Sequence, residues 1–105
     1  MKVNLSGTVR YALASLGNIP IDSGVYLIHD LRGTLYVGKS ANLQRRFEQH
    51  WRKSHNTGLN KALLSPVGQV QFSWIRHPDP GELEKSLVTF IRPICNEIKF
   101  KSTKE

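Results

Sequence analysis

The centre of the chain carries a β-hairpin signature, which constrains the fold more than any other feature of the sequence. Residues 24–29 and 34–38 are short runs rich in β-branched and aromatic residues, which favour strands. The intervening residues 30–33, Asp-Leu-Arg-Gly, fit a type I turn that ends with Gly33 in the left-handed conformation. Two antiparallel strands joined by a three-residue loop are therefore expected here.

The length of this loop decides which residues of the two strands lie opposite each other. Paired residues share a face of the sheet, and so do residues two apart on one strand. Tyr26 and Tyr36 are therefore expected to be diagonal neighbours on one face. The expected pairs are Tyr26 with Gly38, Ile28 with Tyr36, and Asp30 with Thr34.

The two faces of the hairpin differ in composition. On the tyrosine face, Gly24 and Gly38 leave space beside the phenols, which indicates that another group comes close. A cross-strand aromatic pair that only stabilises the hairpin is the simpler interpretation of the two tyrosines. The other face is expected to be the core side and is wholly aliphatic, with Val25, Leu27, Leu35 and Val37.

Helical patterns surround the hairpin. The chain of 105 residues has room for one core, so residues 1–98 are expected to form one domain, followed by a basic tail over 99–105. The order of elements predicts an α+β fold with a small, mostly antiparallel sheet. Beyond the hairpin, helices are expected over 8–16, over 43–53 with Asn42 as N-cap, over 58–64 and over 82–92, and a third strand over 69–75.

Composition excludes several classes of protein. No apolar run approaches the roughly 18 residues that a membrane span needs, and the N-terminus has no apolar core of a secretory signal. The single cysteine, Cys95, excludes an intrachain disulfide framework. A cytoplasmic protein without a membrane association is expected.

The positive charge is concentrated in one segment. The formal net charge is +7, and residues 31–61 hold seven basic residues against one acid, Glu48. A localised positive field suits a polyanion such as the phosphates of a nucleic acid. Basic residues that merely keep a helix surface solvated explain the charge equally well.

Arg46 and His50 stand four residues apart on the helix expected over 43–53, so they lie on one side of it. An arginine can bind a phosphate with two donors, and a histidine can hold or move a proton. Arg45 points about 100° away and is expected to be a surface charge. Taken alone, this pair is better explained as two ordinary solvent-facing residues.

Glu84 lies in the apolar stripe of the last helix, in line with Leu87, Val88 and Ile91, whereas Glu82 is expected on the solvated side. A carboxylate among core-facing residues is costly unless it is paired or bound to a metal. A Mg²⁺ ion held by one carboxylate, phosphate oxygens and waters would need only this acid. A buried structural salt bridge is the alternative.

Residues 33–40 also match the string G-x-x-x-x-G-K-S of nucleotide-binding loops, which would predict ATP or GTP binding through Lys39. The interior residues 34–37 are β-formers that complete the hairpin, whereas a phosphate cradle needs an irregular loop. The strand ending in a Mg²⁺-binding aspartate is also missing. This interpretation is therefore rejected.

Taken together, the motifs resemble the GIY-YIG nuclease family. Residues 24–26 (Gly-Val-Tyr) and 36–38 (Tyr-Val-Gly) are similar to the two halves of the family signature, with Val for Ile in both. Each motif is weak alone, but their order and spacing over residues 19–96 are specific. The later matches are Gly38-Lys39-Ser40, Asn42-Leu43, Arg46, His50, Leu83-Glu84, Pro93 and Asn96.

The resemblance implies a three-stranded antiparallel sheet flanked by helices, and a metal-dependent endonuclease that hydrolyses a DNA phosphodiester. Glu84 would bind Mg²⁺ or Mn²⁺, Arg46 would hold the scissile phosphate, and Tyr26 would take the proton of the attacking water. The resemblance also implies that Tyr36, Lys39 and His50 position water, phosphate and the tyrosine hydroxyls, and that Gly38 and Asn96 support the site. The DNA-facing residues would be Lys39, Arg45, Arg46, Arg52, Lys53 and Lys61.

Two questions stay open at the level of sequence. A non-catalytic nucleic-acid-binding module on the same fold is the main alternative to an enzyme. The resemblance also leaves the pathway undecided among excision repair, restriction, mobile elements and recombination. A homodimer, a partner protein or a particular DNA structure would then supply specificity.

Overall fold

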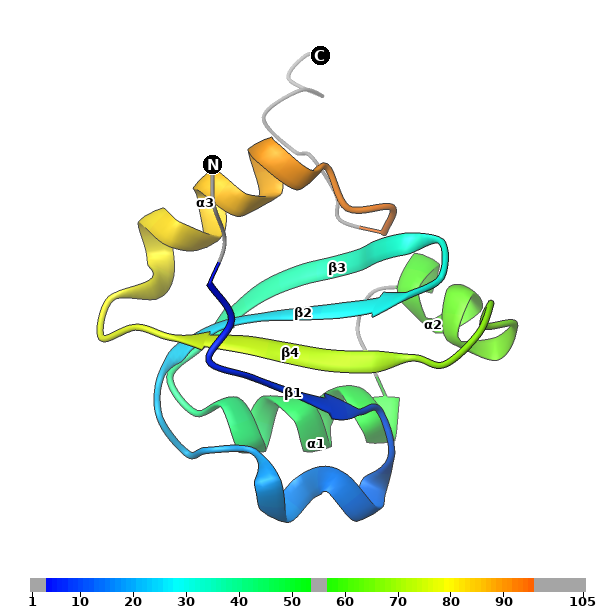
Figure 1. Cartoon of the computed structure of the whole chain (residues 1–105), viewed down its shortest axis with the longest axis horizontal. Coiled ribbons are helices and arrows are strands. Elements are labelled where there is room, and N and C mark those ends of the chain that lie inside the picture. Colours follow the sequence, from blue (N-terminus) through cyan, green and yellow to red (C-terminus); the bar gives the residue numbers. More distant parts are fainter. Residues whose placement is uncertain (1–3, 54–56, 96–105) are drawn as a thin grey trace.

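The computed structural model describes residues 4–53 and 57–95 (Figure 1). Within these residues the helices over 43–53 and 58–64 and the later strand are found close to their expected bounds, and the last helix begins two residues early. The elements are, in order, β1 (Gly7–Arg10), the 3-10 helix η1 (Leu13–Asn18), β2 (Gly24–Asp30), β3 (Gly33–Ser40), α1 (Leu43–Lys53), α2 (Thr57–Leu64), β4 (Gln71–Arg76) and α3 (Pro80–Ile91).

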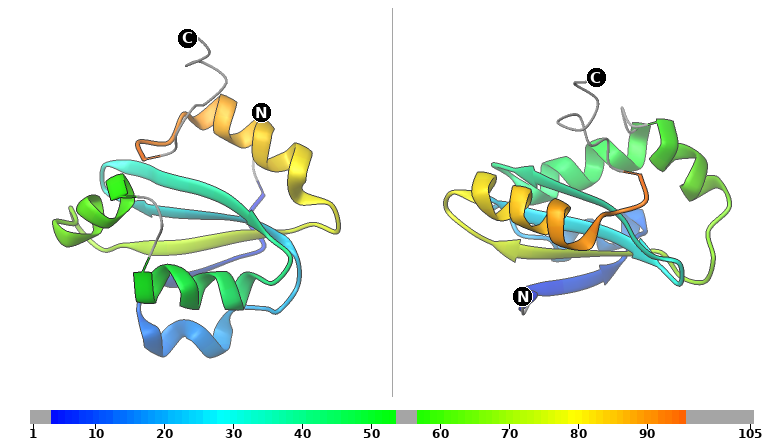
Figure 2. Two further views of the ribbon diagram at one scale, coloured as in Figure 1. Left: turned by 180° about the vertical axis from the view of Figure 1, so that it is seen from behind. Right: turned by 90° about the horizontal axis from the view of Figure 1, so that it is seen from above.

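The strands form one antiparallel sheet in the order β1-β4-β2-β3, so β3 is an edge strand. The sheet lies between two layers of helices. α3 covers one face, where Leu87 packs on Val25, Leu27 and Val37. The view from above shows α1 and α2 on the opposite side of the sheet from α3 (Figure 2). Edge strand β3 therefore runs between α3 and the α1–α2 layer.

The face that carries Tyr26 is the larger core, which corrects the expectation that the aliphatic face is the core side. Tyr26, Ile28 and Phe72 are fully buried there under Leu43 and Phe47 of α1. The apolar side of α1 supplies this cover, because Leu43 and Phe47 recur at the four-residue spacing of a helix.

The N-terminal segment does not form the helix expected over 8–16. Residues 7–10 form β1, which pairs with β4 and adds a fourth strand to the expected three, and η1 follows it. The apolar spacing in this region is real, but Val9 packs from a strand and Leu16 from a 3-10 helix. Tertiary pairing with β4 has overridden a helical pattern that spans only nine residues.

The hairpin has the expected register at the tyrosines and a different one at its turn. Tyr26 pairs with Gly38 and Ile28 with Tyr36, as predicted, but Asp30 pairs with Gly33 instead of Thr34. A β-bulge lies between these pairs, and it turns Leu35 into the Tyr26 core. Because residues 33–40 form strand β3, they are no phosphate-binding loop.

Asp30 explains why the turn closes early. Its carboxylate accepts hydrogen bonds from the Arg32 backbone N–H at 2.8 Å and from the Val67 N–H at 3.0 Å, and it forms an ion pair with the Arg32 guanidinium at 2.6 Å. These contacts hold the pKa of Asp30 at about 2, chiefly through the hydrogen bond from Arg32. Arg32 is therefore engaged in the fold and is not a free surface charge.

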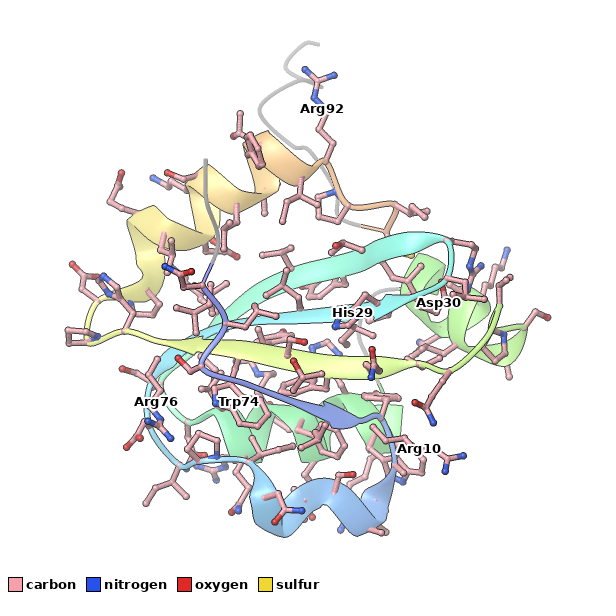
Figure 3. The ribbon with its side chains drawn as sticks, viewed as in Figure 1. Arg10, His29, Asp30, Trp74, Arg76 and Arg92 are labelled. Carbon is pink, nitrogen blue, oxygen red and sulfur yellow. The ribbon has the colours of Figure 1, made fainter. Side chains whose placement is uncertain are left out.

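His29, labelled beside Asp30 in Figure 3, belongs to a polar chain across three strands. Its Nε2 is hydrogen-bonded to the Ser73 hydroxyl at 2.7 Å, and that hydroxyl is 2.8 Å from the Thr8 hydroxyl. Burial lowers the pKa of His29 below 6.5, and the nearby Asp30 opposes this shift only in part.

We expect the pKa of His29 to make the fold less stable in mild acid. Below pH 6.5 the unfolded chain binds a proton at this histidine before the folded chain does, so the free energy of unfolding falls as the pH drops. Urea unfolding at pH 7.5 and 5.5 should show a smaller pH effect in His29→Gln than in the wild type. An equal pH effect in both proteins would contradict this assignment.

No helix in residues 4–53 and 57–95 is both long and apolar enough to cross a membrane.

Candidate active site

Tyr26, Tyr36 and His50 converge on the α1 side of the sheet. The hairpin register predicts that the two tyrosines are neighbours, and the resemblance to the GIY-YIG family implies that His50 joins them. The tyrosine rings are 6.1 Å apart between centroids, and the His50 ring is 5.3 Å from Tyr26 and 5.5 Å from Tyr36. The Tyr26 hydroxyl is hydrogen-bonded to His50 Nε2 at 2.6 Å. The two tyrosines therefore belong to a polar cluster and are more than a cross-strand packing pair.

Helix α1 brings Arg46 and His50 to this cluster. Asn42 starts the helix, because its Oδ1 accepts a hydrogen bond from the Arg45 N–H at 3.0 Å. His50 is only 9% exposed and Arg46 is half-buried, so neither is an ordinary solvent-facing residue. Arg45 points into solvent, as expected.

The pKa of the Tyr26 hydroxyl is strongly perturbed by its surroundings. Burial raises its pKa above the usual value, and the neighbouring Tyr36 raises it further. The Arg46 guanidinium acts in the opposite direction, through its charge and through a hydrogen bond to the phenol. Tyr26 can therefore lose its proton only with help from an adjacent cation or proton acceptor.

Gly38 has a different role from the one that its place on the tyrosine face suggested. A Cβ at Gly38 would collide with the ring and hydroxyl of Tyr26, so the space beside this glycine is filled by Tyr26 itself. The space beside Gly24 is filled in the same way by the backbone of Ile75 on β4. These two glycines therefore leave room for neighbouring parts of the same chain.

The substitution Gly38→Ala should therefore destabilise the protein by about 1–3 kcal/mol, the usual cost of overpacking. Tyr26 cannot easily move aside, because it is fully buried and its ring stacks on Phe72 at 5.3 Å. Gly17→Ala is the matched control, since a Cβ there has no neighbour within 4 Å. Chemical denaturation measures both, and equal stability of the two variants would contradict the packing argument.

Glu84 belongs to α3, the helix that covers the other face of the sheet. It lies on α3, half-buried, three residues before the fully buried Leu87, as its place in the apolar stripe predicts. Glu82 is exposed and 3.8 Å from Lys85, as expected of the solvated side. Within the described ranges Glu84 forms no hydrogen bond or ion pair, so the alternative of a buried salt bridge finds no partner there.

Lys39 lies on the α3 side of the sheet. It pairs with Val25 on β2, and its Nζ lies 3.7 Å from where a Cβ at Gly81 would be. Gly81 and Glu84 are three residues apart on α3, so Lys39 is near the side of the helix that carries Glu84. Edge strand β3 thus has the tyrosines, Arg46 and His50 on one side and Lys39 and Glu84 on the other.

The other expected site residues are more dispersed. Arg52 is exposed and forms an ion pair with Glu48 at 3.0 Å, and Lys61 is exposed on α2. Lys53 ends α1, but its side chain is outside the described part of the structure, as are Asn96 and the tail over 99–105. Phe72 was not singled out from the sequence; alternation placed it on a strand but could not show that it stacks on Tyr26.

The model of the GIY-YIG catalytic domain family matches residues 22–87, a range that holds both tyrosines, Arg46, His50 and Glu84. This chain belongs to the GIY-YIG family. The match confirms the prediction of the GIY-YIG endonuclease class. The prediction of an α+β fold with an antiparallel sheet is confirmed by a solved structure with the same fold.

Curated relatives are UvrABC system proteins C. The chain is 30% identical over 91 residues to the protein of Bacteroides fragilis, an alignment that covers 85% of this chain and 15% of the relative. It is 37% identical over 84 residues to the protein of Legionella pneumophila, covering 77% and 13%. The GIY-YIG chain therefore spans only about 15% of the length of these relatives.

A solved structure shares the fold. It is the GIY-YIG N-terminal endonuclease domain of UvrC from Thermotoga maritima, bound to magnesium as its catalytic divalent cation. Its TM-score with this chain is 0.62 at 20% sequence identity, with 80% of this chain and 93% of that domain covered.

Proposed function

We propose that this GIY-YIG chain is a metal-dependent DNA endonuclease whose active site lies at edge strand β3. The observation that carries the proposal is the cluster of Tyr26, Tyr36, Arg46 and His50, in which a buried phenol is hydrogen-bonded to a histidine and adjoins a guanidinium. Perturbed titratable groups of this kind concentrate at catalytic sites.

The site fits a single divalent cation. The described residues contain no group of three or more His, Cys, Asp or Glu that could hold a metal. Mg²⁺ needs fewer protein ligands, because one carboxylate with phosphate oxygens and waters completes its coordination. Glu84 is such a carboxylate, half-buried and unpaired within the described chain. By analogy with the magnesium-bound UvrC domain, Glu84 would hold Mg²⁺ or Mn²⁺.

The residues of the cluster have distinct tasks in hydrolysis. A bound cation would polarise the scissile phosphate and make the attacking water more acidic. Arg46 would bind a phosphate oxygen and stabilise the charge that develops on it. Tyr26 would accept the proton of the water while its own proton passes to His50 Nε2, 2.6 Å away. Tyr36 and Lys39 would position the water and the phosphate.

The positive surface would hold the DNA backbone. Lys39, Arg45 and Lys61 are described side chains that are exposed and form no ion pair among the described residues. Arg52 contributes less, because Glu48 neutralises it. Phosphate contacts of this kind set affinity and its dependence on salt, and they carry no sequence information.

The direct test is incubation of the purified chain with linear, nicked, branched and supercoiled DNA in Mg²⁺ or Mn²⁺, with EDTA as the control. We expect cleavage of at least one of these substrates, and none in EDTA. Binding without cleavage in either metal would contradict the proposal and favour the non-catalytic binding module.

A further inference from the structure

A groove of about 790 Å³ opens beside the candidate active site, between the end of β1, the C-terminal half of α1, and α2. Its volume lies within the range of sites that take small ligands of nucleotide size. His50 and Arg52 line this groove and have tasks in the function proposed above, but that function leaves the groove itself without a ligand. The lining residues that matter are Arg10, Tyr11, His50, Trp51, Arg52 and Asn60.

The groove has an aromatic wall. Trp51 is 41% exposed, which is unusual because tryptophan has a large apolar ring that is buried in most proteins. Its ring meets Tyr11 at 5.4 Å between centroids, and Tyr11 in turn meets the buried Phe47 at 5.2 Å. The exposed indole is therefore supported by a chain of rings that reaches the core, and its open surface is held ready to stack against a flat group.

Two arginines stand at the same groove. Arg10 ends β1, and Figure 3 shows its side chain pointing away from the sheet. It forms no ion pair in the part of the chain that the structure describes. Arg52 is exposed and forms an ion pair with Glu48. An aromatic surface flanked by arginines suits a ligand with both a flat ring and a negative charge.

We propose that this groove binds an unpaired nucleotide of single-stranded DNA, with the base stacked on Trp51 and the phosphate held by Arg10. Single-stranded nucleic acid is bound in this way, because every base has a face that stacks on an aromatic ring, and basic residues follow the backbone. In duplex DNA the bases are already stacked on one another, so the Trp51 surface would be left unused.

The groove adjoins the catalytic cluster through His50. This residue lines the groove, while its Nε2 is bonded to the Tyr26 hydroxyl. A strand that leaves a duplex at the active site could therefore place its next unpaired nucleotide against Trp51. The inference rests on the proposed function and names its substrate class: duplex DNA that carries a single-stranded flap.

The test compares Trp51→Leu with Phe90→Leu. Phe90 is an exposed aromatic residue on α3, on the other side of the sheet, at 57% exposure. Binding to a fluorescent dT₁₂ oligonucleotide and to a 12-base-pair duplex is measured by anisotropy in EDTA. We expect Trp51→Leu to weaken dT₁₂ binding about tenfold, from the loss of one stacked base, and to leave duplex binding unchanged. Phe90→Leu should bind both as the wild type does.

Intrinsic fluorescence gives a second readout. The chain has two tryptophans, and Trp74 is only 5% exposed. Added dT₁₂ should therefore quench the emission of Trp51, and Arg10→Ala should raise the oligonucleotide concentration needed for half-quenching. Absence of quenching at concentrations that saturate the anisotropy would overturn the proposal.

Three further results would also overturn it: equal dT₁₂ binding by Trp51→Leu and the wild type, an equal loss on dT₁₂ and duplex, or tighter binding of rU₁₂ than of dT₁₂. Because EDTA removes catalysis, these outcomes are independent of the proposed function. A chain that binds dT₁₂ through Trp51 yet cleaves no DNA would refute the nuclease proposal alone.

Discussion

Replacing Glu84 with alanine should abolish DNA cleavage while leaving DNA binding within about twofold of the wild type. The carboxylate is the proposed protein ligand of the cation, and several kcal/mol of transition-state stabilisation correspond to a loss of about a thousandfold or more in rate. Binding should persist because Glu84 carries no positive charge and forms no ion pair with a described residue. Single-turnover cleavage and anisotropy measure the two effects separately.

Glu82→Ala is the matched control. Glu82 lies on the same helix but is exposed, and it forms an ion pair with Lys85 at 3.8 Å. An exposed pair of this kind contributes little to stability, so this variant should cleave as the wild type does. If Glu84→Ala cleaved at the rate of Glu82→Ala, the role of Glu84 as metal ligand would be refuted.

Arg46→Ala should also lower cleavage, by about a hundredfold to a thousandfold, which is typical for the loss of one group that stabilises a developing oxyanion. A second effect follows from the contact between Arg46 and Tyr26. The guanidinium lowers the pKa of the Tyr26 phenol, so its removal should move the pH dependence of cleavage to higher pH. The measurement is single-turnover cleavage across a pH series.

Arg45→Ala separates this role from simple charge. Arg45 is the adjacent residue but points into solvent. Its loss should lower the salt dependence of DNA binding by about one unit of slope and leave the cleavage rate of bound DNA unchanged. Should Arg46→Ala behave in the same way as Arg45→Ala, Arg46 would be a backbone contact only.

The central hairpin and α1 could be predicted from the sequence because their signals are local. The pairing of Tyr26 with Gly38 is predicted from the length of the loop, and Asn42 marks the start of α1. The turn differs from the prediction because the Asp30 carboxylate also binds the Val67 N–H, 37 residues away. The sequence of the turn does not indicate a partner so far along the chain.

The helix predicted for the N-terminal segment is wrong for a similar reason. Val9 and Leu16 fit one face of a helix, yet β1 forms because β4 offers it a free strand edge at Phe72 and Trp74. Gly7 fits that place because a Cβ there would collide with the Trp74 ring. The residues of β4 that stabilise β1 by pairing are more than sixty positions away, so a local sequence pattern cannot predict this strand.

The candidate site shows the same division. The i, i+4 spacing of Arg46 and His50 predicts that they share a side of α1, and the structure places that side against the tyrosines. The alternation of the strand predicts on which face of the sheet Tyr26 lies. It does not predict that Tyr26 is buried, because burial depends on which helix covers that face. The position of Glu84 in an apolar helical stripe is enough to single it out in the sequence. That it lies across β3 from the cluster could be seen only in the tertiary fold.

Crystals grown with Mn²⁺ would test the central claim most directly, namely that one cation is held at β3 between Glu84 and the tyrosine cluster. We expect a single strong anomalous peak within coordination distance of the Glu84 carboxylate, with the Tyr36 hydroxyl and the Arg46 guanidinium facing the same space. The peak should be absent from crystals of Glu84→Ala. A peak elsewhere on the chain, or a Glu84 carboxylate that points away from β3, would contradict the account.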